Sequence, residues 1–193
     1  PDEKVFRRWA ERSRPGFLFA VKGWRFITHV NRLRNAGRDV DTILTRARLL
    51  GEHLGPILWQ LPPSLGPDLP LLRDFVAILP DDLHHVLEFR HTGWFTDRTY
   101  DLLSEKGCCA LCLYHMAQFE TPVLTTAPFA YIRFHGPEQH HGGSYPDEAL
   151  DTWAGRIRTF LDAGHTVWAY FNNDPNAHAT RDARRLIARL AGA

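Results

Sequence analysis

The chain has 193 residues, of which 44% are hydrophobic and 23% are charged, as in soluble globular domains and unlike disordered, collagen-like or coiled-coil sequences. Its 23 Lys and Arg residues against 22 Asp and Glu give a formal net charge of +1, which excludes a broadly basic nucleic-acid coat protein and an acidic tail protein. No run approaches the roughly 18 apolar residues that span a bilayer, and the charged N-terminus lacks a signal peptide's apolar core. We therefore expect a cytoplasmic protein without membrane contact.

The three cysteines are Cys108, Cys109 and Cys112. An odd number in one small cluster does not fit the disulfide framework of a secreted domain. On a strand, Cys109 and Cys112 face opposite sides, so they are poorly placed to share a zinc ion. We expect both to be small, buried, unligated core residues.

Six short apolar runs, most of them rich in Val, Ile, Phe or Tyr, predict strands. They are Phe17–Lys22, Pro56–Leu61, His85–Arg90, Cys109–Tyr114, Phe129–His135 and Thr166–Asn172.

Amphipathic stretches with helical spacing lie before and between these runs. They predict helices over 2–12, 40–50 and 69–79, a helix that ends at Gly107, one from Pro146 to just before Gly164, and a last one after Pro175 through Leu190. The connection from Gly23 to Arg38 is long enough to hold a short helix of its own.

Strict alternation of strand and helix predicts one α/β domain over residues 1–193, with a parallel sheet covered by helices. An open doubly wound sheet and a (β/α)8 barrel both fit this order. The glycine-rich strand-to-helix turn of a dinucleotide fold is missing after every strand, which disfavours the first. A complete barrel needs eight units, and the sequence shows six.

Four tryptophans are expected in the core because they lie in predicted strands, Trp59 and Trp168, or on the apolar stripes of helices, Trp9 and Trp153. Trp94 follows the third strand, and two roles are left as alternatives for it: it lines the mouth of a pocket or it packs in the core.

Chemistry in parallel α/β folds lies at the carboxyl ends of the strands. Those ends carry, in chain order, Lys22, Gln60, Glu88 with Arg90, His115, Arg133 with His135, and Asn172 with Asn173 and Asp174. Because strand side chains alternate, Glu88 shares a face with Arg90, and Arg133 shares one with His135. We predict that these four groups converge in one concave site.

Two interpretations of this charged cluster are open. One is an internal ion-pair network that fills the barrel interior. The other, which we favour, is a pocket for a polar ligand, since every charged group falls at the end of a strand. Two arginines, a lysine and a histidine together suit an anionic substrate, a phosphoester or a carboxylate.

The loop that contains His135, His140 and His141 also holds two adjacent glycines. Metal binding, a lid and a solvated histidine-rich loop are all conceivable uses. No set of Asp, Glu and His shows clear ligand spacing, so we predict no metal ligands, and the sequence clearly implies no cofactor.

Five segments together resemble the DUF72 (YecE-like) family. They are FLFAVKGWRFITHVNRL (17–33), LGPILWQLPPS (54–64), LEFRHTGWF (87–95), YIRFHG (131–136) and VWAYFNND (167–174). They stand in the family's order, and the match runs from Asp2 to the C-terminus. The resemblance implies a TIM-like barrel without an established activity. The broader barrel group includes metal-dependent sugar isomerases and AP-endonuclease-like enzymes, an analogy of fold only.

The sequence departs from the family pattern in two ways. The usual first strand with a Gly-Thr-Ser-Gly-Trp-like motif and the second with a Glu-x-Asn-like motif are absent, so the chain starts just after the family's second strand. The fourth strand, which usually ends in an acidic residue, here reads Leu113–Tyr114–His115. We therefore expect an incomplete barrel of six units, with an apolar gap between the edges of the first and last strands that the full gene product or a partner chain fills.

The leading functional hypothesis is a hydrolase-like or isomerase-like enzyme acting on a small anionic ligand. In this hypothesis the catalytic residues are Glu88 as general acid/base, His135 as proton shuttle and Lys22. The substrate-binding residues are Arg90, Arg133, Gln60, Asn172, Asn173 and Asp174.

Two other interpretations stay open. One is a non-catalytic protein that binds a nucleic-acid backbone or a metabolite, and the other is an inactive fragment. Oligomers could form through the open barrel edges.

Overall fold

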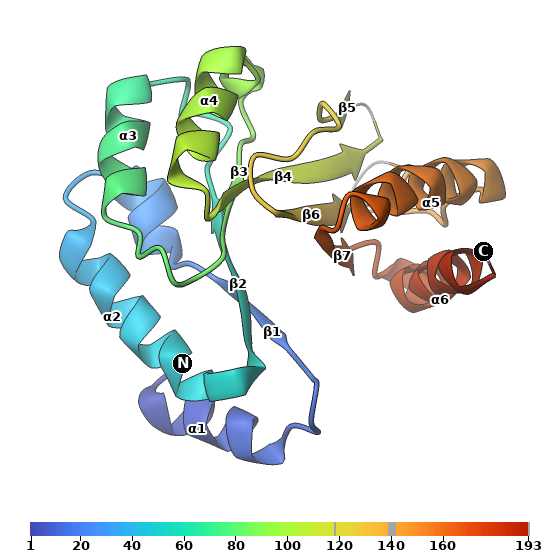
Figure 1. The fold of residues 1–193 in the computed structure, drawn as a ribbon, viewed down its shortest axis with the longest axis horizontal. Coiled ribbons are helices and arrows are strands. Elements are labelled where there is room, and N and C mark those ends of the chain that lie inside the picture. The colour runs from blue at the N-terminus through green and yellow to red at the C-terminus, as the bar shows by residue number, and fades with distance from the viewer. Residues whose placement is uncertain (118, 139–141, 193) are drawn as a thin grey trace. The chain divides into compact units, whose positions relative to one another are not determined.

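The computed structural model describes residues 1–117, 119–138 and 142–192 (Figure 1). The chain divides into two compact units, Pro1–Ala110 and Leu111–Ala193. The single domain over residues 1–193 stays a prediction.

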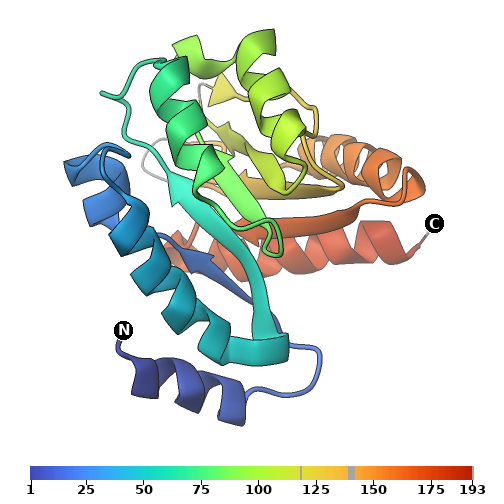
Figure 2. The same cartoon turned by 60° about the vertical axis from the view of Figure 1, so that its left-hand side comes forward.

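The first unit holds three parallel strands in the order β1-β2-β3. Their bounds are β1 Phe19–Lys22, β2 Leu54–Gln60 and β3 His85–Glu88. Its α-helices are α1 Glu3–Arg12, α2 Gly37–Ala47, α3 Leu69–Ala77 and α4 Asp97–Lys106, and its shorter turns are η1 Phe26–Val30, η2 Arg48–His53 and η3 Thr92–Trp94. Helices α2 and α3 lie along one side of these strands (Figure 2).

Strand β4, Cys109–Met116, begins in the first unit and continues into the second. There it pairs in parallel with β6 Phe129–Phe134, which pairs in parallel with β7 Thr166–Phe171. The two-residue strand β5, Phe119–Glu120, is antiparallel to β4. Helices α5 Asp147–Asp162 and α6 His178–Ala191, the latter preceded by η5 Pro175–Ala177, pack on each other and on β7 (Figure 1).

All six predicted strands and the parallel alternation with helices are confirmed. Among the described residues β1 has one neighbouring strand, β2, and β7 has one, β6, so each leaves a strand edge without a ladder partner. The short helix expected between Gly23 and Arg38 is present as the π-helical turn η1. None of the helices in the described part of the chain is long and apolar enough to cross a membrane.

Trp59 anchors the core of the first unit. Its ring is fully buried and meets Phe75 of α3 edge to face, with ring centroids 5.3 Å apart. Its indole Nε1–H donates to Nδ1 of His85, 3.2 Å away, and His85 Nε2 lies 3.1 Å from the carbonyl oxygen of Pro80. A neutral His85 with its proton on Nε2 satisfies both hydrogen bonds.

Two of the tryptophans predicted to be core residues are not fully buried. Trp9 is 40% exposed, although its ring stacks on Phe19, because α1 turns Phe6 rather than Trp9 into the core. Trp168 is half-buried and lies on β7, which among the described residues pairs only with β6. Trp153 is buried as predicted. Trp94 is a core residue, stacked on Phe89 and donating to the carbonyl oxygen of Leu65.

We predict that Gly23→Ala destabilises the protein by about 1–3 kcal/mol. A Cβ at Gly23 would lie 2.6 Å from Cζ3 of Trp59, whose buried ring has no room to move. Gly155→Ala is the matched control, because a Cβ there meets nothing within 4 Å and alanine favours the helix by up to about 1 kcal/mol. Urea unfolding followed by circular dichroism measures both, and equal effects of the two variants would contradict this account.

Acid should weaken the Trp59–His85 contact. Burial lowers the pKa of His85 to about 4, so the unfolded chain binds this proton more readily between about pH 6.5 and pH 4. The contribution of neutral His85 to the free energy of unfolding is fully present above pH 6.5, and about 3 kcal/mol of it is lost as the pH falls to 4. Urea titrations at several pH values should show a flatter dependence in His85→Phe and an unchanged one in His91→Gln, at an exposed histidine. An unchanged dependence in His85→Phe would refute the assignment.

Candidate functional site

A continuous row of hydrogen bonds crosses the carboxyl ends of β1, β2 and β3. Lys22 Nζ donates to Gln60 Oε1 at 2.6 Å, and Gln60 Nε2 donates to Glu88 Oε1 at 2.8 Å. Parallel register brings this about, because Gln60 lies directly opposite Glu88, and Lys22 lies opposite Leu58, two residues before Gln60. Three residues predicted from sequence as site residues are therefore in contact.

Glu88 is the buried centre of this row. It is fully buried, and Arg90, two residues further on, places both Nε and Nη2 on Glu88 Oε1. The Arg90 side chain is itself only 13% exposed, so the pair is largely desolvated. Such a pair is stable only with good geometry and further hydrogen bonds, and here Gln60 supplies one.

The connection after β1 adds positive charge at the same strand end. Burial lowers the pKa of His29, and the nearby Arg25 and Lys22 lower it further. Arg32 Nη2 donates to Ser64 Oγ at 2.7 Å, which ties this connection to the loop after β2. Arg25, His29 and Arg32 were not among the predicted site residues, although they lie within the 17–33 segment that carries the family resemblance.

In the second unit, Arg133 and Asn172 are in contact. Arg133 Nε donates to Asn172 Oδ1 at 3.1 Å, and the Asn172 N–H extends the β6–β7 ladder by donating to Phe134 O. His135 is buried, with its N–H bonded to His115 O and its ring edge-on to Tyr114. The convergence of Arg133 and His135 with Glu88 and Arg90 stays a prediction.

Asp182 of α6 organises the end of β7. This fully buried carboxylate accepts hydrogen bonds from Ser144 Oγ, the Tyr145 N–H, Asn173 Nδ2 and Arg185 Nη1. Burial by itself would raise the pKa of Asp182, but these hydrogen bonds hold it below its usual range. The amide of Asn173 also donates to Gly143 O, so Asn173 joins the loop before α5 to α6. Asp174, beside it, is exposed.

His115 lies at the position where the sequence departs from the family pattern. Its Nδ1 is 3.1 Å from the hydroxyl of Tyr145, and that hydroxyl accepts the N–H of Gly136 at 3.0 Å. Burial lowers the pKa of His115 and raises that of Tyr145. A neutral imidazole–phenol pair therefore occupies this position.

Within residues 1–117, 119–138 and 142–192, no group of three or more His, Cys, Asp or Glu side chains could hold a metal ion. His140 and His141 of the histidine-rich loop lie outside the described residues.

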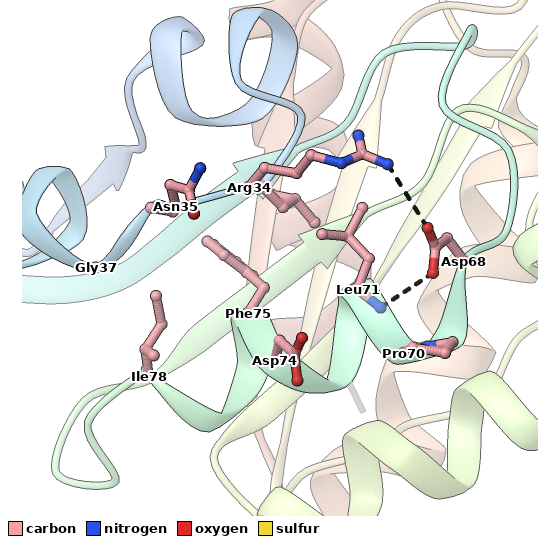
Figure 3. A pocket seen from close by; sticks show the side chains of 11 residues that line it. Arg34, Asn35, Gly37, Asp68, Pro70, Leu71, Asp74, Phe75 and Ile78 are labelled. Atoms are coloured by element: carbon pink, nitrogen blue, oxygen red, sulfur yellow. Dashed lines mark hydrogen bonds and ion pairs between the residues drawn. The ribbon is translucent and has the colours of Figure 1, made fainter.

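A cavity of about 550 Å³ lies on the first unit between the start of α2 and helix α3 (Figure 3). Leu71 and Phe75 point into it, and Arg34 reaches across to Asp68, 3.9 Å away. Asp68 also caps α3 by accepting the N–H of Leu71. None of the site residues predicted from sequence lines this cavity.

Comparison with known proteins places the chain in a family. The model of the family described as "Protein of unknown function DUF72" matches residues 1–193. The chain belongs to the DUF72 family. The fold is that of DUF72 proteins of known structure, so the predicted TIM-like α/β class is confirmed.

Two solved DUF72 structures show this likeness. The protein from Thermotoga maritima MSB8 has a TM-score of 0.86 at 24% identity, over 99% of this chain and 80% of that one. The protein from Enterococcus faecalis V583 has a TM-score of 0.86 at 17% identity, with the same coverage. At these identities the likeness concerns the fold alone.

A curated relative is UPF0759 protein YecE of Escherichia coli K12, which is 34% identical over 96 residues. The match covers 49% of this chain and 35% of YecE. The chain thus matches about a third of the length of this relative.

We predict that Asp182→Ala destabilises the protein by about 3–5 kcal/mol, because it leaves Arg185 and the buried amide of Asn173 without the carboxylate. The matched control is Asp162→Ala, at an exposed residue at the end of α5, which should change stability by less than about 0.5 kcal/mol. Urea unfolding at pH 7 measures both variants. A loss below 1 kcal/mol in Asp182→Ala would show that the network is not needed.

Proposed function

We propose that this DUF72 protein binds a small anionic ligand, a phosphoester or a carboxylate, at the carboxyl ends of its strands. The observation that carries this proposal is the row Lys22–Gln60–Glu88–Arg90, in which the Gln60 amide bonds Lys22 and Glu88, and Arg90 bonds Glu88. Arg25 lies close enough to His29 to lower its pKa, so the same end carries further positive charge. Guanidinium and ammonium groups at a partly desolvated strand end suit an anion.

Each residue has a role in this proposal. Lys22, Arg90 and Arg133 contact the anion, while Gln60 and the asparagines and aspartate at 172–174 position the ligand. The contact of Arg133 with Asn172 supports this by fixing the guanidinium in one orientation. If the protein is an enzyme, Glu88 is the general acid/base and His135 moves the proton, so a hydrolase or isomerase type of reaction fits.

The second candidate is a non-catalytic protein that binds a nucleic-acid backbone, whose phosphodiester is the same kind of anion. The η1 turn favours it, because Phe26 is 50% exposed beside Arg25, and an exposed aromatic ring beside a cation suits a stacked base.

Isothermal titration with inorganic phosphate, pyrophosphate and citrate tests the proposal. We predict that at least one of these anions binds, and that Lys22→Met and Arg133→Met each weaken it about tenfold, which is about 1.4 kcal/mol. The control is Arg73→Met on α3, where an exposed arginine pairs with Glu105 and lies in none of the predicted site positions. The proposal is wrong if no anion binds, or if Arg73→Met weakens binding as much as the other two.

Two further measurements separate the candidates. Where a set of phosphoesters shows turnover, Glu88→Gln should abolish turnover and retain binding, which supports an enzyme. A single-stranded oligonucleotide whose affinity falls steeply with salt, without turnover, supports the nucleic-acid binder.

A further inference from the structure

The turn η1, with Arg25 just before it, presents an exposed face that is part apolar and part basic. Phe26 and Val30 are four residues apart, so they are neighbours on a helical surface. The same spacing places Arg25 beside His29. Phe26 is 50% exposed and Val30 is 60% exposed, while Ile27 between them is fully buried. Two large apolar side chains therefore lie next to each other in solvent, beside a guanidinium and an imidazole.

Contacts before and after η1 fix it at the carboxyl end of β1. Before it, the Gly23 N–H donates to Leu58 O at 2.8 Å and continues the parallel ladder beyond Lys22. After it, Arg32 and Leu33 have positive φ values of 48° and 67°. Such residues persist only where other contacts hold them, and here Arg32 is bonded to the loop after β2 and Leu33 is buried. The exposed face is therefore preorganised, which reduces the entropy lost when a ligand binds.

Arg25 supplies positive charge that no carboxylate offsets. Its side chain forms no hydrogen bond or ion pair with any residue in the part of the chain that the structure describes. Arg90, by contrast, is paired with the buried Glu88. An uncompensated cation at these strand ends thus lies directly beside the Phe26 ring. π-Helical turns such as η1 are rare in proteins and are frequent at functional sites.

We propose that the anion bound at these strand ends is a phosphomonoester that carries a flat aromatic group, with the phosphate at Arg25 and Lys22 and the aromatic group stacked on Phe26. This inference rests on the anion site proposed above and names the class of ligand that the site prefers. A phosphomonoester carries about −1.5 to −2 charges at pH 7, so two cations suit it. An exposed aromatic ring offers its face to another flat ring, and Val30 adds apolar surface beside it. Aryl phosphates and nucleoside monophosphates both belong to this class.

The experiment compares inorganic phosphate, cyclohexyl phosphate and phenyl phosphate by isothermal titration at one salt concentration. Cyclohexyl phosphate is the matched ligand, because its apolar ring is similar in size to phenyl but is not flat. We expect phenyl phosphate to bind at least about fivefold more tightly than either of the other two. This preference of the parent protein is a test that needs no variant.

Variants locate the preference on η1. In Phe26→Ala the preference for phenyl phosphate should disappear, while the affinity for inorganic phosphate stays within about twofold of the parent. Arg25→Met should weaken all three ligands about tenfold, since they share the phosphate group. The control is Ile78→Ala, at another exposed apolar residue of the first unit, which should change none of the three affinities. Far-UV circular dichroism of each variant confirms that the fold is retained.

A short thymidine strand without terminal phosphates separates a small ester from a nucleic acid. We expect this strand to bind more weakly than phenyl phosphate, because its phosphodiesters each carry one charge and it has no monoester. If the strand binds more tightly than phenyl phosphate and loses that affinity in Phe26→Ala, the ring serves nucleic-acid binding and the proposal of a small phosphomonoester is overturned.

The proposal is also overturned if phenyl phosphate binds no more tightly than cyclohexyl phosphate, or if the preference survives in Phe26→Ala. In both cases the binding of inorganic phosphate shows that the anion site itself stands. If neither these phosphates nor pyrophosphate and citrate bind, the proposed function fails, and this inference fails with it.

Discussion

A carboxylate that is fully buried at the end of β3 has to be given partners, and the arrangement of the first unit follows from that need. Glu88 accepts hydrogen bonds from Arg90, two residues further along the chain, and from Gln60 on the neighbouring strand β2. Gln60 in turn accepts a hydrogen bond from Lys22 on β1. Parallel register is what makes the row continuous, since residues that end their strands stand side by side. Burial would be energetically costly for Glu88 alone. The pairing that offsets this cost holds Lys22 and Arg90 in place at the carboxyl ends of the strands.

The sequence predicted the structure well where a regular repeat of apolar residues determines the secondary structure. Apolar runs located all six parallel strands, and strand parity placed Glu88 and Arg90 together. It was uninformative where tertiary packing decides. Trp9 lies on an apolar stripe, but α1 buries Phe6 instead, and Trp168 lies on a strand that has one neighbour within the part of the chain that the structure describes. The two-residue strand β5 carries too little pattern to be recognised.

The candidate site was predicted in part for similar reasons. The residues at strand ends follow from topology, so Lys22, Gln60, Glu88 and Arg90 were found, and Arg133 with Asn172. Arg25 and His29 were missed, because their placement depends on a π-helical turn, which has no periodic signal. A residue at a strand end can also have a structural role, which its position in the sequence does not reveal. Asn173, for example, donates a hydrogen bond to the buried Asp182.

Our central proposal is that the strand ends of this DUF72 protein bind an anion. The most direct test is a crystal structure of the protein soaked in tungstate, an anomalously scattering analogue of phosphate. We predict an anomalous peak within hydrogen-bonding distance of Arg133 and of Lys22 or Arg90, with the side-chain ends of Glu88, Arg90, Arg133 and His135 within about 12 Å of one another. A peak elsewhere only, or a larger separation of these four groups, would contradict the claim.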